Sequence, residues 1–271
     1  MSVVLVTGAS TGFGRLTVEA LAERGHRVFA GIRDPHGRNE TAAKDLTAIG
    51  VRVIELDVTD QDSADRAIAE LLTETGHLDV IVNNAGGIFV GPVEAFTAEQ
   101  VQRQFDVNTL GAVRVNRAAL PHLRAQGSGA LIQIGSIAAR VTVPFSGLYA
   151  ASKAALAALT EAWHDELAPF GVESVIVDAA SYPTNIGANA TFGQADAYTA
   201  AFGAYVAAIS AQPAGDPDEV AAAVVRLVET PDGQRPRRTV IGPAAQVEAV
   251  TALNREAERA AHAVTAAMGI R

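Results

Sequence analysis

The sequence predicts one doubly wound α/β domain, in which helices cover both faces of a parallel sheet, and three observations lead to this fold class. Short runs of β-branched and aliphatic residues recur along the chain. Between these runs lie stretches with apolar residues at helical spacing. The strand-like runs are apolar throughout, which is typical of strands buried on both faces, and helical connections pair such strands in parallel. Since no composition shift divides the chain, we expect residues 1–271 to form a single domain.

Seven runs are expected to form the strands of this sheet. They are 3–6, 27–32, 51–56, 79–82, 130–134, 172–177 and 238–241. Two segments depart from the alternation of strands and helices. Residues 181–217 mix aromatic, glycine, asparagine and proline residues and are expected to form a substrate-binding lid. An alanine-rich run over 244–268 predicts a C-terminal helix.

The composition indicates a folded protein and excludes several classes of function. The 271 residues are 49% hydrophobic and 19% charged, which supplies enough apolar surface to form a core. A formal net charge of −9 argues against a nucleic-acid partner. The chain has no cysteine, and no two histidines have the spacing of metal ligands, so we expect no metal. The absence of a signal peptide or a long apolar run predicts a cytoplasmic protein without a membrane partner.

A glycine-rich turn, Thr7-Gly8-Ala9-Ser10-Thr11-Gly12-Phe13-Gly14, follows the first predicted strand and leads directly into a helix. Glycines at such a turn allow a positive φ and let a pyrophosphate approach the backbone, while free amides at the helix start supply hydrogen-bond donors. This position after a first strand predicts a dinucleotide site. The expected cofactor contacts in the turn are Gly8, Ser10, Thr11, Gly12, Phe13 and Gly14.

Two other interpretations of the turn remain open. The glycines could serve only to pack the helix against the strand. The run from Gly8 to Gly12 also matches G-x-S-x-G, the nucleophile turn of a serine hydrolase, with Ser10 as the nucleophile. That alternative needs a histidine in a loop after a strand, and none of the six histidines has an obvious position of this kind.

The end of the second predicted strand favours NADP(H) over NAD(H). An acidic residue there binds the adenine ribose, whereas a basic residue accommodates a 2′-phosphate. Ile32 stands where the acidic residue is expected, and Arg33 follows. A guanidinium pairs with a phosphate through forked donors. Asp34, the next residue, weakens this preference.

Tyr149 and Lys153 form a candidate proton-transfer pair, because a spacing of four residues places them on one helix face. At about 5 Å and an effective dielectric near 20, a lysine cation would favour the phenolate by roughly 3 kcal/mol, or about two pKa units. We therefore expect Lys153 to lower the pKa of Tyr149 toward the range useful for acid–base catalysis. By itself the pattern also fits a solvated helix face.

Taken together, these motifs resemble the short-chain dehydrogenase/reductase family over nearly the whole chain. The matching motifs are the turn at 7–14, Asp57-Val58 after the third strand, Asn83-Asn84-Ala85-Gly86 after the fourth, and the tetrad Asn108, Ser136, Tyr149 and Lys153. The resemblance implies a Rossmann-type sheet of seven parallel strands in the order 3-2-1-4-5-6-7. It also implies cofactor contacts at Arg33, Asp57, Val58, Asn84, Ala85, Gly86, Tyr149, Lys153 and Thr184.

The resemblance implies a role for each member of the tetrad. Tyr149 would give a proton to a carbonyl oxygen, and Ser136 would hydrogen-bond the same oxygen. Lys153 would bind the nicotinamide ribose, and Asn108 would hold a water molecule. The expected activity is NADP(H)-dependent carbonyl reduction, reversible as an alcohol dehydrogenase. A nucleotide-binding sensor or scaffold without turnover is the alternative.

One departure from the family pattern lies after the sixth predicted strand. The family usually carries Pro-Gly there, whereas this chain carries Ala179-Ala180, with Thr184 still at the expected spacing. We expect the two alanines to add methyl bulk beside the nicotinamide and to change the pocket or the cofactor affinity.

The expected substrate pocket is apolar and aromatic, with walls from 87–90, 137–145 and 181–205. This composition predicts a lipophilic ketone or secondary alcohol as the substrate. The candidate substrate contacts are Ser136, Phe145, Tyr149, Tyr182, Phe192 and Phe202. The resemblance also implies a homodimer or homotetramer, formed through the helices that carry Asn108 and Tyr149.

Overall fold

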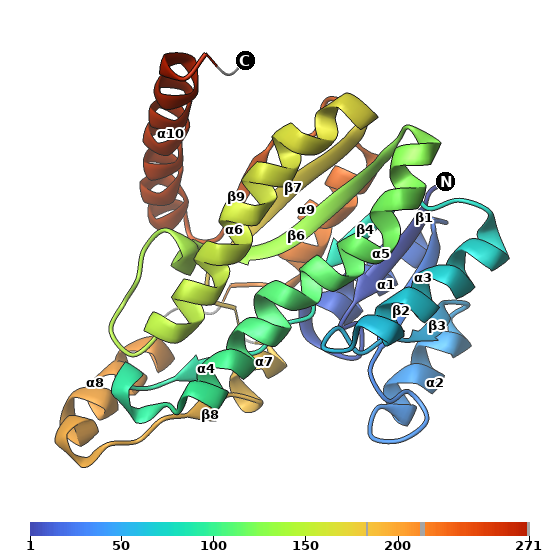
Figure 1. Cartoon of the computed structure of the whole chain (residues 1–271). Helices are drawn as coiled ribbons and strands as arrows, with labels where there is room; N and C mark the ends of the chain where they lie inside the picture. Colours follow the sequence, from blue (N-terminus) through green and yellow to red (C-terminus); the bar gives the residue numbers. More distant parts are fainter. Residues whose placement is uncertain (183, 212–214, 270–271) are drawn as a thin grey trace.

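A seven-stranded parallel sheet forms the centre of the protein in the computed structural model, which describes residues 1–182, 184–211 and 215–269 (Figure 1). The strands are β1 (Val3–Thr7), β2 (Arg27–Ile32), β3 (Arg52–Glu55), β4 (Val80–Asn83), β6 (Gly129–Ser136), β7 (Val172–Ala179) and β9 (Arg238–Ile241). Their order is β3-β2-β1-β4-β6-β7-β9, and every neighbouring pair is parallel. Counted within this sheet alone, the order is 3-2-1-4-5-6-7, as expected.

Helices cover both faces of the sheet, because alternate residues of each buried strand point to opposite sides. Val4 and Val6 of β1 belong to one core cluster, whereas Leu5 belongs to the other. The first cluster is covered by α1 (Gly12–Glu23), α2 (Glu40–Ala48) and α9 (Asp218–Glu229). The second is covered by α3 (Gln61–Thr75), α5 (Gly111–Gln126) and α6 (Gly147–Leu167).

Local capping signals set the ends of several helices. The Asp60 carboxylate accepts a hydrogen bond from the backbone N–H of Asp62 and so begins α3, which ends at Gly76 with a φ of 74°. Gly127 ends α5 in the same left-handed conformation, with a φ of 75°. These glycines turn the chain back into the next strand, and so fix where that strand starts.

Shorter elements lie beyond the carboxyl edge of the sheet. These are β5 (Phe89–Val90), β8 (Thr191–Phe192), α4 (Ala98–Phe105), the π-helical turn η2 (Asp106–Leu110), α7 (Asn185–Ala188) and α8 (Thr199–Ser210), with the 3-10 turns η1 (Val93–Ala95), η3 (Ile137–Ala139) and η5 (Asp196–Tyr198). The 3-10 turn η4 (Ala168–Phe170) precedes β7 at the opposite edge. β5 pairs with β8, so the segment after β7 is joined to the loop after β4. The lid expected over 181–217 lies partly outside the described residues, at 183 and 212–214.

The C-terminal helix α10 (Ala244–Ala267) agrees with the helix expected over 244–268. It projects away from the sheet layers at the upper left of Figure 1. Within it only Val250 and Asn254 are buried. Among the helices that the structure describes, none combines the length and apolar character needed to cross a membrane.

Candidate active site

The glycine turn between β1 and α1 is shaped by close backbone contacts. Gly8 and Gly12 have φ values of 64° and 58°, a region that favours glycine. A Cβ built on Gly14 would lie 2.5 Å from the carbonyl oxygen of Gly8 and would collide with the side chain of Asn84. Only glycine, which has no side chain, fits at position 14. Its lack of a side chain also leaves the backbone at the start of α1 accessible.

The loop after β4 holds this turn in place. The Nδ2 of Asn84 donates to the carbonyl oxygens of Thr7 at 2.9 Å and Gly8 at 3.2 Å. The Thr7 hydroxyl in turn accepts from the backbone N–H groups of Asn84 and Ala85, both at 3.0 Å. Asn84 thus acts on the turn from behind, as a structural support.

The start of α1 is an anion-binding environment. Its N-cap residue, Thr11, makes no side-chain cap hydrogen bond, and the first turn of the helix has no acidic residue. Such free amides and the positive end of the helix dipole attract phosphate groups. Gly12 faces Thr184, whose Cβ would lie 3.6 Å from a Cβ on the glycine. The uncapped, acid-free start of α1 therefore fits the pyrophosphate of a dinucleotide.

The two loops that would flank an adenosine lie at the same edge of the sheet. Asp57 follows β3, and its Oδ1 accepts from the N–H and hydroxyl of Thr59 at 2.9 and 2.7 Å. Val58 is buried against Gly111. These contacts fix the loop that carries Asp57 and Val58.

The loop after β2 presents a cation to this edge. Arg33 is exposed, and within the described chain its side chain makes no hydrogen bond or ion pair. Asp34 has a φ of 49°, and its carboxylate accepts from the backbone N–H of Arg38 at 2.9 Å. Asp34 is therefore engaged within its own loop, while Arg33 is free to meet a ligand.

The four tetrad residues come from three neighbouring elements. Ser136 ends β6, Tyr149 and Lys153 lie one turn apart on α6, and Asn108 lies in η2. Lys153 is buried, and its Nζ donates to the carbonyl oxygen of Ile134 at 2.8 Å. The Nζ lies 6.0 Å from the centroid of the Tyr149 ring.

Asn108 is a clamp on the loop after β4. Its Oδ1 accepts from the N–H of Gly87 at 2.8 Å, and its Nδ2 donates to the Gly87 carbonyl at 3.0 Å. The same Nδ2 donates to the Ser152 hydroxyl at 3.0 Å, which ties η2 to α6. A Cβ on Gly86 would lie 3.4 Å from Asn108 Oδ1 and 3.7 Å from Lys153 Nζ, so this loop also contacts the tetrad.

Burial controls the protonation of the Tyr149–Lys153 pair. Burial raises the pKa of Tyr149. A hydrogen bond with the Ser136 hydroxyl opposes this rise, and the charge of Asp178 adds to it. Burial also lowers the pKa of Lys153 from 10.5 to about 8. The expectation that Lys153 lowers the pKa of Tyr149 is wrong for this structure, because desolvation outweighs a cation that lies beside the ring and donates elsewhere. Tyr149 is a protonated phenol at neutral pH.

The sequence matches the short chain dehydrogenase family pattern over residues 2–195. The chain belongs to the short-chain dehydrogenase family. The curated 3-ketodihydrosphingosine reductase of Bacteroides thetaiotaomicron is 33% identical over 251 residues, which cover 90% of this chain and 89% of that protein. A short-chain dehydrogenase from Streptomyces avermitilis has a TM-score of 0.82 at 34% identity, covering 99% of this chain and 97% of that one.

A second solved structure of similar fold contains a cofactor derivative. It is an alcohol dehydrogenase from Thermococcus sibiricus complexed with 5-hydroxy-NADP, with a TM-score of 0.73 and 28% identity, covering 89% of this chain and 96% of that one. The protein is accordingly an oxidoreductase of the short-chain dehydrogenase family, acting between CH–OH and carbonyl groups.

The hydrolase interpretation of Ser10 does not fit a short-chain dehydrogenase. Across residues 1–182, 184–211 and 215–269, the hydrogen bonds of histidine rings go to other groups. His26 accepts from the Ser2 N–H, and His164 contacts the Ser174 carbonyl. Ser10 is part of the glycine turn, without a base to activate it.

Aromatic side chains gather on the lid side of this short-chain dehydrogenase. Phe145, which has a φ of 65°, lies at the centre of the group. Its ring centroid is 5.3 Å from that of Phe202, 5.4 Å from that of Tyr205 and 6.4 Å from that of Tyr198. Phe192 joins the group through Phe202 at 6.4 Å. These five rings are called the aromatic cluster below.

Tyr182 lies apart from the aromatic cluster. Its ring packs edge-on against Phe13 at 5.6 Å between centroids, and its hydroxyl donates to Glu219 Oε2 at 3.0 Å. Tyr182 is buried in the core cluster beneath α9. The structure therefore separates Tyr182 from Phe145, Phe192 and Phe202, with which the sequence grouped it.

Ala179 and Ala180, which replace the usual Pro-Gly, stand at the end of β7. Ala179 is buried in the core, and the methyl group of Ala180 faces Gly242, where a further Cβ would collide with it. The N–H of Ala180 donates to the Ile241 carbonyl at 2.8 Å and so extends the pairing of β7 with β9. Both methyl groups thus pack against the core and Gly242, and an effect of the two alanines on the pocket or the cofactor affinity stays a prediction.

A buried ionic group in the strand next to β6 could not be predicted from the sequence. Asp178 in β7 is fully buried and forms an ion pair with Arg238 of β9. Arg238 also donates to Glu161 of α6 at 2.6 Å. The available signal was a carboxylate inside an otherwise apolar run, Val175 to Ala180.

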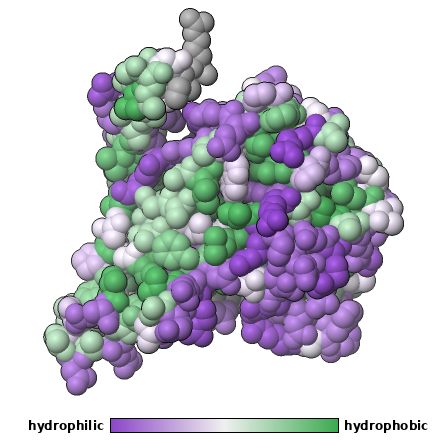
Figure 2. Space-filling view, in the orientation of Figure 1, coloured by the Kyte–Doolittle hydropathy of each residue, from purple (hydrophilic) through white to green (hydrophobic). Residues whose placement is uncertain are grey.

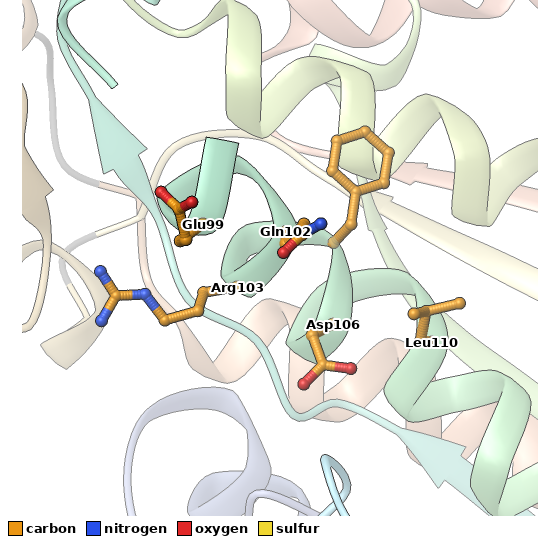
Figure 3. Close-up of a pocket in the computed structure, with 6 residues that line it drawn as sticks. Glu99, Gln102, Arg103, Asp106 and Leu110 are labelled. Carbon is orange, nitrogen blue, oxygen red and sulfur yellow. The ribbon is translucent and has the colours of Figure 1, made fainter. Parts of the chain in front are cut away.

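A hollow on the protein surface lies away from these residues. It is lined by Glu99, Gln102, Arg103, Phe105, Asp106 and Leu110 of α4 and η2 (Figure 3). None of the predicted cofactor, catalytic or substrate residues lines it. It lies on the outer side of η2, whose Asn108 faces inward.

Proposed function

We propose that the protein is an NADP(H)-dependent carbonyl reductase, also able to act as an alcohol dehydrogenase, that reduces a lipophilic ketone. The observation that carries this proposal is the convergence of Ser136, Tyr149 and Lys153 beside the glycine turn, at the carboxyl edge of the sheet. The nicotinamide, when bound, supplies or accepts the hydride.

Each tetrad residue then has a task that its environment supports. The Tyr149 phenol, protonated at neutral pH, gives its proton to the carbonyl oxygen during reduction. The Ser136 hydroxyl hydrogen-bonds this oxygen and also stabilises the phenolate that remains. Lys153 binds the ribose hydroxyls of the nicotinamide nucleotide, and Asn108 holds the Gly87 loop, which places the backbone next to Lys153.

The cofactor binds along the turn, and Arg33 meets the 2′-phosphate. The Asp34 carboxylate accepts from the Arg38 N–H, which holds this acidic side chain in its own loop. The alcohol dehydrogenase that was solved with an NADP derivative supports the same cofactor class. The proposed contacts are Gly8, Ser10, Thr11, Gly12, Phe13, Gly14, Arg33, Asp57, Val58, Asn84, Ala85, Gly86, Tyr149, Lys153 and Thr184.

The aromatic cluster supports a lipophilic substrate. Phe145, Phe192 and Phe202 contribute rings without charge, so a long-chain or ring-containing ketone gains contact area there. Phe192 remains 53% exposed, which leaves surface for such a molecule to cover. The resemblance to a 3-ketodihydrosphingosine reductase agrees with this class.

A second copy of the chain would bind over η2 and α6, giving a homodimer or homotetramer. Figure 2 shows apolar residues over the middle of this face, whereas the part over α2 and α3 is hydrophilic. Leu110 is 45% exposed at the rim of the hollow in Figure 3. Sedimentation at several concentrations tests this assembly; a monomer at all of them would contradict it.

Parallel titrations with NADPH and NADH, followed by a panel of bulky and small ketones, test the function. The proposal predicts tighter binding of NADPH and its oxidation when a lipophilic ketone is added. Tight binding without turnover over the whole panel would instead favour the sensor or scaffold alternative. Equal binding of both cofactors would contradict the role of Arg33.

A further inference from the structure

A chain of ion pairs, buried at Asp178 and Arg238, runs from β7 to the edge of the sheet. Asp178 pairs with Arg238, and Arg238 donates to Glu161. Glu161 also accepts from Arg140, whose Nε donates to Asn254 of α10 at 2.9 Å. The arginine of the first pair is itself only 6% exposed. A buried ion pair of this kind is weak evidence for a contribution to stability.

Asp178 lies in β7, directly beside β6, the strand that ends at Ser136. It pairs in register with Gly135, and a Cβ on that glycine would collide with its Oδ1. Gly135 stands between Ser136 and Ile134, whose carbonyl accepts from Lys153. The carboxylate therefore occupies the space that a side chain next to the catalytic serine would otherwise fill.

One oxygen of this carboxylate is left without a hydrogen-bond partner. Arg238 binds Oδ2, while Oδ1, which faces Gly135, has no partner among the described residues. An unpaired carboxylate oxygen in a buried site exerts a strong field on nearby charges. The titratable groups of the tetrad that this carboxylate influences are Tyr149 and Lys153.

We propose that Asp178 is a positioning residue of the proton-transfer site, whose buried carboxylate, held by Arg238 beside Gly135, acts electrostatically on Lys153 and Tyr149. This inference rests on the proposed reductase function only for its effect on turnover. The effect on Lys153 is a property of the protein without substrate or cofactor.

The directions of the pKa changes agree with this role. Burial lowers the pKa of Lys153, and the charge of Asp178 opposes that fall. Asp178 also raises the pKa of Tyr149. The pKa of Asp178 itself is raised by burial, and three cations oppose that rise: Arg238 from β9, Arg140 after η3 and Lys153 from α6.

The pKa of Lys153 can be measured directly, because the chain has only two lysines, Lys44 and Lys153. Lysine labelled with 13C at the ε carbon gives two NMR signals, whose pH titrations report the two pKa values directly. Lys44 is 73% exposed and serves as an internal control. The expected result in the wild type is a Lys153 titration near 8.

Asp178→Asn should lower the pKa of Lys153 by about one unit, as loss of a nearby opposite charge does, and leave Lys44 unchanged. Asp178→Glu, which keeps the charge, should restore the wild-type titration. Asp165→Asn is the matched control, because Asp165 lies on α6 and pairs with Arg237 at 2.6 Å but is 73% exposed. It should leave both titrations unchanged.

The double variant Asp178→Asn/Arg238→Gln removes both buried charges and serves if the single variant does not fold. Since the carboxylate, and not Arg238, acts on Lys153, the double variant should also lower the pKa of Lys153. An unchanged Lys153 titration in whichever variant folds would overturn the proposal.

Turnover gives a second, separable readout. In Asp178→Asn, the pH at which ketone reduction declines on the basic side should fall by about one unit together with the Lys153 pKa. A wild-type protein that reduces no ketone would overturn the proposed function, while the lysine titrations would still decide the role of Asp178. A Lys153 shift without a shift of the basic limb in an active enzyme would overturn the catalytic part of the inference.

Discussion

Gly14→Ala tests whether the glycine turn is as tightly packed as the structure indicates. A Cβ at this position would lie 2.5 Å from the Gly8 carbonyl oxygen, about 0.9 Å inside an ordinary contact of 3.4 Å. The obstructing groups are backbone and the Asn84 amide, which cannot swing aside without losing its bonds to Thr7 and Gly8. The turn as a whole must therefore shift.

The size of the effect follows from three contributions. Overpacking a tight site costs about 1–3 kcal/mol. Loss of the two Asn84 hydrogen bonds adds roughly 0.5–1.5 kcal/mol each. The higher helix propensity of alanine returns about 1 kcal/mol. The free energy of unfolding should fall by about 1–5 kcal/mol, and cofactor affinity should fall as well.

Urea denaturation followed by circular dichroism measures this change. The matched control is Gly203→Ala in α8, where a Cβ would meet no atom within 4 Å. The control should gain up to about 1 kcal/mol from helix propensity. If Gly14→Ala were as stable as the wild type or as the control, the close packing deduced for the turn would be refuted.

Three further substitutions address the cofactor, the clamp and the buried lysine. Arg33→Ala should weaken NADPH binding by roughly 1.5–3 kcal/mol, or about 10- to 150-fold. NADH binding should be unchanged in the same fluorescence titration. An equal loss for both cofactors would contradict the contact between Arg33 and the 2′-phosphate. Asn108→Ala removes two hydrogen bonds to Gly87 and one to Ser152. Thermal unfolding should therefore show that the free energy of unfolding falls by about 2–4 kcal/mol. An unchanged midpoint would show that these hydrogen bonds are not needed for stability. Because burial lowers the pKa of Lys153 to about 8, the unfolded chain binds more protons than the folded one between that pH and 10.5, and wild-type stability gains from this residue as pH rises. The stability of Lys153→Met relative to wild type should therefore fall by about 3 kcal/mol between pH 7 and pH 10.5, and a pH-independent difference would contradict the depressed pKa.

Much of the fold was predictable because its signals are local. Continuous apolar strands such as Val3–Thr7 and the helical spacing between them allow little besides a parallel sheet with two helical layers. The glycine turn and the positions of Tyr149 and Lys153 also follow from short-range spacing. Strand order came from the family resemblance and agrees with the structure.

Features that depend on tertiary packing could not be predicted from the sequence. Tyr182 looks like other aromatic residues of the lid segment, but contacts with Phe13 and Glu219 decide its place in the core. The pKa of Tyr149 depends on burial and on Asp178, a residue 29 positions away in the sequence. The methyl group of Ala180 turns toward Gly242, which only the pairing of β7 with β9 determines.

Removal of a single hydroxyl group tests most directly the claim that Tyr149 gives the proton in ketone reduction. Tyr149→Phe removes the phenolic hydroxyl and keeps the ring, so the proposed proton donor is lost while the packing is retained. Ketone reduction should fall by about 10²–10⁴-fold with NADPH affinity unchanged, as measured by cofactor oxidation and fluorescence titration on the same sample. Reduction at the wild-type rate by the Tyr149→Phe protein would contradict the account.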